Sequence, residues 1–265
     1  AVAEPKRAAS GFWRDGTRGA AWGWLPALCL SASAALLLLA LADAAARNSA
    51  AYADALFWLG LVVLVAPIAW RLCMPIPTEA ERLALLALLG LTLFSVKLLE
   101  YPGGFTFFDE FLHWRTAQDI AASGHLYAPN PLLPISPLYP GLEIVTTALS
   151  SLTGLSLFAS GMIVLGVARL LLVGGLYFFY RRIGGSARIA SLATLLYMAN
   201  PHFLFFESQF AYESLALPLG AFTLWLVARS VAAHRTRERV AFAGLAVAAG
   251  GALALTHHIS SYATL

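Results

Sequence analysis

Long apolar runs, broken by short polar segments, dominate the chain. No residue is charged between Arg18 and Asp43, and four shorter charge-free runs follow. A helix needs roughly 20 apolar residues to cross the hydrocarbon layer, and somewhat fewer when its ends snorkel, so these runs predict membrane-spanning helices. We expect an all-α integral membrane protein with about seven spans, at residues 20–42, 53–70, 83–99, 157–180, 187–206, 212–228 and 240–256.

Composition supports lipid as the solvent. The 265 residues are 60% hydrophobic and 12% charged, whereas a soluble domain carries about 25% charged residues.

The first apolar run is longer than the roughly 7–15 residues of a signal-peptide core, so we interpret it as a retained span. Cys29 and Cys73 lie in or beside apolar runs and resemble small apolar residues more than a disulfide pair. We expect one transmembrane domain over residues 1–265, forming the N-terminal part of a longer chain.

The basic residues predict the orientation. With the N-terminus in the cytoplasm, 13 of the 17 basic residues fall in cytoplasmic segments, while Arg47, Lys97 and Arg115 fall outside and Arg169 lies within a span. The positive-inside rule selects this orientation. The net charge of +3 then reflects topology, and we expect no nucleic-acid partner. We expect a multi-pass protein of the plasma membrane.

Residues 100–156 leave the membrane on the outer side. Residues 109–122 fit a short helix that Ser123-Gly124 ends, and a second amphipathic helix follows Pro140. Five prolines between them favour an extended link. We expect both helices to lie along the outer interface. Their expected apolar faces are Phe111, Trp114, Ala117 and Ala121 in the first, and Leu142, Val145, Leu149 and Leu152 in the second, with Glu143 elsewhere on the surface.

An acidic pair opens this outer segment. Asp109, Glu110 and His113 can share one face of a helix, because they are three and four positions apart. A carboxylate at a membrane surface can act as a general base or bind a cation. The simpler interpretation is that Asp109 caps the helix, and the two roles do not exclude each other.

Further polar residues gather at the outer ends of later spans. Glu207 and Glu213 flank a short turn, where they either contribute to a site or mark the membrane edge. His257 and His258 end the last span and suit phosphate or substrate contact better than metal binding, although they can equally be interfacial histidines.

Arg169 lies in the middle of a span. A charge within the membrane is costly and suggests either a function or a buried structural pair, for example with a backbone carbonyl. We expect it about 15 Å from the outer acids, or roughly half a span.

From residue 100 to about residue 225, the chain resembles the GT-C superfamily of membrane glycosyltransferases. The residues that carry this resemblance are Asp109-Glu110, the stretches His113–Ile120 and Gly124–Tyr127, the proline-rich passage Pro137–Leu142, Asn200-Pro201, Glu207 and Tyr212-Glu213. In one respect the chain departs from the family, which places the acidic loop after its first span: here two further spans, at residues 20–42 and 53–70, come before that span. We treat these two as an added hairpin.

The resemblance implies a GT-C-like helical bundle that transfers a sugar from a polyprenyl-phosphate donor to an extracytoplasmic glycan, lipid or protein acceptor. It places Asp109 at the catalytic position as general base and Glu110 as its partner. Expected substrate-binding residues are His113, Arg115, Glu207, Tyr212, Glu213, His257 and His258. A divalent ion, Mg²⁺ or Mn²⁺, held by Glu110 and Glu213 or by Glu207, is a possible cofactor that would neutralise the phosphate.

Two other functions are open at this point. A transporter or flippase of lipid-linked sugars is expected to place ionisable residues near the bilayer midplane on interrupted helices, where the sequence offers only Arg169. The second alternative function is an assembly subunit that keeps the fold but has no enzymatic activity.

Overall fold

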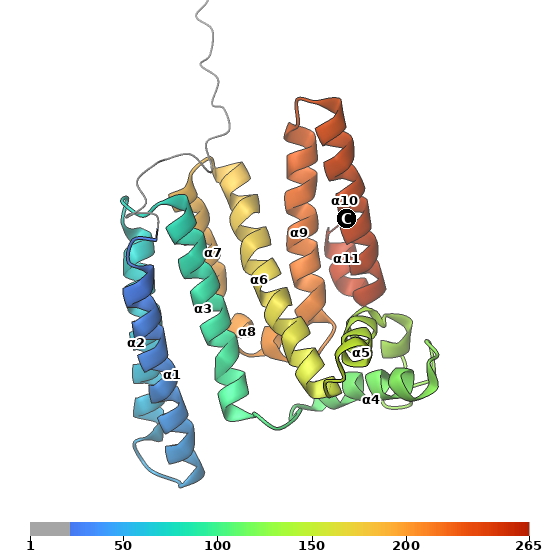
Figure 1. Ribbon diagram of the computed structural model, residues 1–265, viewed down its shortest axis with the longest axis horizontal. Coiled ribbons are helices and arrows are strands. Elements are labelled where there is room, and N and C mark those ends of the chain that lie inside the picture. The colour runs from blue at the N-terminus through green and yellow to red at the C-terminus, as the bar shows by residue number, and fades with distance from the viewer. Residues whose placement is uncertain (1–21, 265) are drawn as a thin grey trace, which may run out of the picture.

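The computed structural model describes residues 22–264, which form helices joined by short connections (Figure 1). The helices are α1 (Leu25–Arg47), α2 (Ala53–Cys73), α3 (Glu79–Glu100), α4 (Phe108–Ser123), η1 (Ser136–Leu138), α5 (Gly141–Thr153), α6 (Leu157–Gly184), α7 (Ala187–Met198), α8 (Pro201–Leu204), η2 (Phe206–Ser208), α9 (Glu213–Ala232), α10 (Thr236–Thr256) and α11 (His258–Thr264). Six of them, α1, α2, α3, α6, α9 and α10, are long and apolar enough to cross a membrane. The all-helical architecture is confirmed and is consistent with a multi-pass membrane protein.

The long helices lie side by side, and neighbours in sequence alternate in direction, except that α6 and α9 run the same way because the shorter α7 returns the chain between them (Figure 1). Helix α6 packs against α3, α7 and α9, so it forms the centre of the bundle. A buried cluster that includes Leu64, Leu86, Leu172 and Phe203 joins α2, α3, α6 and α8. Many large apolar side chains instead point outward, among them Leu196 at 77% exposure. This surface fits contact with lipid, because soluble proteins avoid large exposed apolar patches.

The fifth predicted span is not one straight helix. Helix α7 ends at Met198, and the segment Pro201–Ser208 continues at an angle of 76°. Proline cannot continue the hydrogen-bond ladder and restricts the residue before it. The side chain of Asn200 accepts a hydrogen bond from the backbone N–H of His202 and starts the new helix. The span predicted over residues 187–206 therefore corresponds to a bent pair of helices, which together are long and apolar enough to be one broken span or a re-entrant segment.

The first span is shifted along the chain relative to its predicted bounds. Helix α1 runs to Arg47, where residues 20–42 were expected, and residues 20 and 21 lie outside the described part. Two polar contacts extend it. Arg47 pairs with Asp43 one turn earlier at 2.8 Å and donates to the carbonyl of Glu100 on α3 at 2.7 Å. Charged residues can therefore form the last turn of a span.

Most described basic residues gather at one end of the bundle, which we call the basic end. It is uppermost in Figure 1, where α2 meets α3, α6 meets α7, and α9 meets α10. Its arginines are Arg71, Arg82, Arg181, Arg182, Arg188, Arg229, Arg235, Arg237 and Arg239. Helices α4 and α5 lie at the opposite end, and α4 runs across the ends of the long helices (Figure 1).

Helices α4 and α5 form where they were predicted, and their predicted apolar faces are partly buried, since Ala117 and Leu142 belong to a buried cluster against which Trp114 and Leu149 pack. Helix α4 buries Glu110, Leu112, His113, Thr116 and Ala117, whereas Phe111 is 43% exposed. Helix α5 buries Leu142, Glu143, Thr146 and Thr147, whereas Leu152 is 86% exposed. The two helices thus bury polar as well as apolar side chains and turn other apolar side chains outward. Exposed apolar side chains suit helices at a membrane interface, where the surroundings are apolar.

The proline-rich link between α4 and α5 is mostly irregular, as expected, apart from the short helix η1. Asn130 fixes it to α4, because its amide donates to the carbonyl of Leu112 at 3.0 Å and its side-chain oxygen accepts from the N–H of Leu132 at 3.0 Å. The hydroxyl of Ser136 lies 3.1 Å from that of Thr116. The link between α4 and α5 is therefore held to α4 by buried polar contacts.

Candidate active site

A pocket of about 380 Å³ lies near the α4 end of the bundle. Its lining residues are Asp109, Asn200, His202, Phe206, Glu207, Gln209, Ala211, Glu213 and Leu217. Three acids that the sequence singled out, Asp109, Glu207 and Glu213, therefore line one cavity, although about 100 residues separate the first from the other two. They come from α4, η2 and α9 respectively.

Asp109 is exposed and occupies the first turn of α4. The capping role considered for it belongs to Glu110, whose Oε2 accepts hydrogen bonds from the backbone N–H groups of Thr106 and Phe107 at 3.1 and 3.2 Å. Among residues 22–264, no hydrogen bond or ion pair involves the Asp109 carboxylate. The side chain is therefore available to a ligand in the pocket.

Glu110 is fully buried and joins three segments. Its carboxylate pairs with the ammonium of Lys97 on α3, and Oε1 also accepts from the backbone N–H of Phe210 at 2.9 Å. The oxygens of Glu110 therefore face an ammonium and three backbone donors. This geometry suits an anchor that holds the start of α4 against α3 and the turn before α9.

His113 lies one turn after Asp109 and is also buried. Its Nδ1 lies 2.7 Å from Oε1 of Glu143 on α5, and the Glu143 side chain has no measurable exposure. A carboxylate on one ring nitrogen fixes the orientation of an imidazole and defines which nitrogen remains free. Glu143 thus orients His113 from the neighbouring helix.

Aromatic rings extend from His113 toward the end of α10. The ring of Tyr212 lies 4.4 Å from that of His113 and stacks on His257 at 4.3 Å. His258 lies 5.1 Å from His257, and Tyr139 lies 4.9 Å from His258. We call these five residues the aromatic cluster. It adjoins the pocket at Glu213, whose Oε1 is 3.7 Å from Nε2 of His257.

Burial shifts the pKa values of two members of this cluster, His257 and Tyr212. It lowers the pKa of His257 to about 4, and the neighbouring His258 and His113 add to the effect. His257 is therefore neutral at pH 7, with Nδ1 2.8 Å from the hydroxyl of Ser260. Burial also raises the pKa of Tyr212, with the nearby Glu213 as the next cause. The phenol remains protonated and can donate a hydrogen bond.

The Glu207 side chain is largely buried and is held by protein contacts. Its Oε2 is 3.7 Å from a guanidinium nitrogen of Arg169, and its Oε1 accepts from the hydroxyl of Tyr197 at 2.7 Å. Arg169 also donates to the carbonyl of Phe203 and to the hydroxyl of Ser208, both at 2.5 Å. The expected buried contact of Arg169 is confirmed. The expected separation of about 15 Å from the outer acids was wrong for Glu207, because the bent segment after α7 turns back into the bundle.

Arg115 is not brought to the pocket. Its exposed side chain pairs with Asp119 one turn later on α4, at 3.0 Å. The structure therefore separates Arg115 from the other expected substrate-binding residues.

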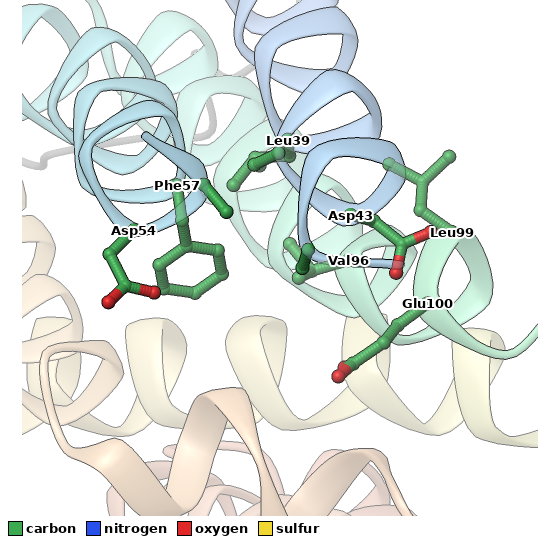
Figure 2. A pocket seen from close by; sticks show the side chains of 10 residues that line it. Leu39, Asp43, Asp54, Phe57, Val96, Leu99 and Glu100 are labelled. Atoms are coloured by element: carbon green, nitrogen blue, oxygen red, sulfur yellow. The ribbon is translucent and has the colours of Figure 1, made fainter. Parts of the chain in front are cut away.

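A smaller pocket of about 140 Å³ lies among α1, α2 and α3 (Figure 2). Its acids are Asp43, Asp54 and Glu100, and Figure 2 shows Asp54 across the pocket from the other two. Asp43 is paired with Arg47 at 2.8 Å. The pocket contains none of the residues expected to act, and its other lining residues are apolar.

Glu110 and Glu213, the expected metal ligands, have other neighbours: Glu110 faces Lys97, and Glu213 lies beside His257. Within residues 22–264, no group of three or more His, Cys, Asp or Glu side chains is arranged to hold a metal ion. Glu110, one of the expected ligands, already faces the ammonium of Lys97, and a cation next to an ammonium is repelled. We therefore derive no chemical step through a metal.

Three residues of this region were not assigned a role from sequence. Glu143 was expected on the polar surface of its helix, Lys97 at a span end, and Tyr197 within a span. The spacing of α4 and α5 cannot show that their polar sides face each other. A lysine shortly before an acidic pair was the one available signal for Lys97.

No family model, curated protein or solved structure matches the chain.

Proposed function

We propose that the chain is a membrane glycosyltransferase that passes a sugar from a polyprenyl-phosphate donor to an acceptor hydroxyl, with Asp109 as the general base. The observation that carries this proposal is the shared pocket of Asp109, Glu207 and Glu213, in which Asp109 has no described protein partner. Carboxylates accept hydrogen bonds from sugar hydroxyls, and a free one can take a proton.

In the proposed reaction the acceptor oxygen attacks the anomeric carbon of the donor sugar. Its proton passes to Asp109 as the new C–O bond forms and the bond from the anomeric carbon to the phosphate oxygen breaks. The electron pair of the broken bond leaves with the polyprenyl phosphate. Because the phosphate can carry this negative charge, the leaving group needs no general acid. The transition state resembles an oxocarbenium ion, which nearby carboxylates stabilise.

Residues in and beside the pocket divide between recognition and positioning. Glu213 lines the pocket and is suited to bind hydroxyl groups, and the buried, neutral His257 lies beside it. Glu110 and Lys97 are positioning residues, because they fix the first turn of α4 on which Asp109 lies. The exposed Phe206 lines the cavity with Leu217 of α9. Such an apolar wall suits the polyprenyl chain.

A transporter of lipid-linked sugars is the second candidate, and one observation favours it. The bend of 76° after α7 and the buried Arg169–Glu207 pair form an interrupted helix with ionisable residues inside the bundle. However, Arg169 is bound to Phe203, Ser208 and Glu207. An arginine with so many protein partners stabilises the bend and has little capacity left for a substrate.

The test uses purified protein in lipid nanodiscs with a panel of polyprenyl-phosphate sugars that differ in the sugar. We expect release of polyprenyl phosphate and transfer of the sugar to an added glycan or lipid acceptor. Liposomes that contain the same protein and a fluorescent lipid-linked sugar measure movement between leaflets. Leaflet exchange without release of polyprenyl phosphate would favour the transporter. Binding of donor with neither activity would favour an assembly subunit.

A further inference from the structure

A third cavity lies at the basic end, on the far side of the bundle from the candidate active site. It has a volume of about 410 Å³ and is formed where α6, α9 and α10 meet (Figure 1). Its lining residues are Phe178, Arg181, Arg182, Gly185, Trp225, Arg229 and Phe242. Three guanidinium groups and three aromatic rings thus surround one cavity, and no carboxylate of residues 22–264 lines it.

The charge of this cavity is largely uncompensated. Arg181 pairs with Glu79 at 3.1 Å. Arg182 and Arg229 are exposed and pair with no carboxylate among the described residues. The Arg229 guanidinium lies 4.9 Å from the centre of the Phe242 ring. Two arginines from helices that are distant in sequence therefore face the same space with hydrogen-bond donors to spare.

Other arginines at the basic end differ from this pair. Arg71 is bound to Glu81, with 2.8 Å between Nε and Oε1. Arg82 donates to the carbonyls of Leu72 and Met74 and to the hydroxyl of Ser191. These side chains join helices and have few donors left. A general excess of positive charge at one end does not explain why two unpaired arginines line a cavity.

The walls of the cavity are apolar. Trp225 lies 5.5 Å from Phe178 and 6.5 Å from Phe242, measured between ring centres. All three rings are partly exposed and belong to helices that can span a membrane. Aromatic side chains at the ends of spans lie at the level of lipid headgroups. The cavity thus combines cationic donors with apolar walls at that level.

We propose that this cavity binds an anionic phospholipid. The phosphate group lies between Arg182 and Arg229, with charge-assisted hydrogen bonds from both guanidinium groups. The glycerol and the start of the acyl chains lie along Trp225 and Phe178. Basic pockets between membrane helices bind lipid headgroups in this way. The site lies at the opposite end from Asp109, so it stands or fails independently of the transferase proposal.

Native mass spectrometry of the delipidated protein in detergent tests this site. Phosphatidylglycerol and phosphatidylcholine are titrated onto the wild type, onto Arg182→Gln/Arg229→Gln, and onto the control Arg188→Gln/Arg237→Gln. The control removes two exposed arginines from the same end that do not line the cavity. We expect the wild type to prefer phosphatidylglycerol, and the cavity variant to bind it roughly thirtyfold more weakly. The control should lose less than about threefold.

A second arm measures the thermal stability of each protein with inorganic phosphate alone. Equal weakening of phospholipid binding in both double variants would overturn the proposal, because it would mean general charge attraction. Stabilisation by inorganic phosphate without a preference for phosphatidylglycerol would also overturn it, in favour of a soluble phosphate ligand. Retained circular dichroism in the cavity variant excludes misfolding as the cause of any loss.

Discussion

Oε1 of Glu143 lies 2.7 Å from Nδ1 of His113, and both side chains are buried between α4 and α5. The second oxygen of Glu143 has no hydrogen-bond partner among the described residues. His113 is therefore the main hydrogen-bond partner of the buried Glu143 carboxylate, and the orientation of the His113 ring depends on Glu143.

Replacing Glu143 should destabilise the outer helices. Glu143→Leu removes the partner of a buried imidazole, which costs about 2 kcal/mol. Glu143→Gln can still accept a hydrogen bond from Nδ1–H and should cost less. The control Ser151→Leu changes an exposed position of the same helix and should have little effect. Chemical denaturation in detergent measures all three, and equal stability of Glu143→Leu and the control would contradict the contact.

The sequence predicted the spans well because lipid imposes a strong local requirement. A helix that crosses the hydrocarbon needs a long apolar run whatever its neighbours are, so α2, α3, α6, α9 and α10 could be located from composition alone. The break after α7 was harder to predict. Asn200-Pro201 signals an interruption, but only packing decides whether a chain bends there or continues after a kink.

The sequence indicated which acids could contribute to the candidate site, but it could not show in which direction each side chain points. Asp109, Glu207 and Glu213 were selected from their places beside predicted spans and from the family resemblance, and they line one pocket. The inward direction of Glu143 depends on how α4 and α5 pack, which spacing does not specify. The sequence suggested Asp109 as the cap of α4, but Phe107 is the N-cap residue and the Glu110 side chain accepts from its N–H.

Acid should destabilise the protein through His257. Its pKa in the folded state is about 4, below the ordinary value of 6.5, so the unfolded chain binds the proton more readily. The stability that His257 contributes is present above pH 6.5 and is lost as the pH falls from 6.5 toward 4. Thermal unfolding at pH 7.5 and 4.5 should show a smaller difference for His257→Gln than for the wild type. His234→Gln, at an exposed position, is the control and should retain the wild-type difference.

Arg169→Leu should lower stability by about 3 kcal/mol, because it leaves the buried Glu207 without its cation. Arg169→Leu/Glu207→Leu removes both charges and should recover part of the loss, since the two residues are coupled. Denaturant unfolding of the two single variants and the double variant measures the coupling. Additive losses would show that the two charges do not stabilise each other.

Gly141 allows α5 to approach the end of α10. A Cβ at this position would lie 2.3 Å from the hydroxyl oxygen of Thr256 and 2.9 Å from its Cα, so one helix must move. We expect Gly141→Ala to cost about 1–3 kcal/mol. The control is Gly244→Ala in α10, where a Cβ meets nothing within 4 Å and improves helix propensity. If both variants unfold at the wild-type temperature, the close approach does not exist in solution.

Asp109→Asn tests the base directly. The Asp109 carboxylate has no described protein partner, and Glu110 caps the helix, so the substitution should leave the fold and donor binding unchanged. A neutral amide cannot take the proton of the acceptor hydroxyl, and transfer should fall about 100-fold or more. Asp119→Asn, a similar change later on α4 at a residue paired with Arg115, should keep near-normal activity. The measurement is sugar transfer by each purified protein, with donor affinity and melting temperature measured on the same samples. A folded Asp109→Asn protein that still transfers sugar at the wild-type rate would remove Asp109 from the reaction. Equal losses of activity in the two variants would mean that α4 tolerates neither change. The general base would then have to be sought at Glu213, which lines the same pocket.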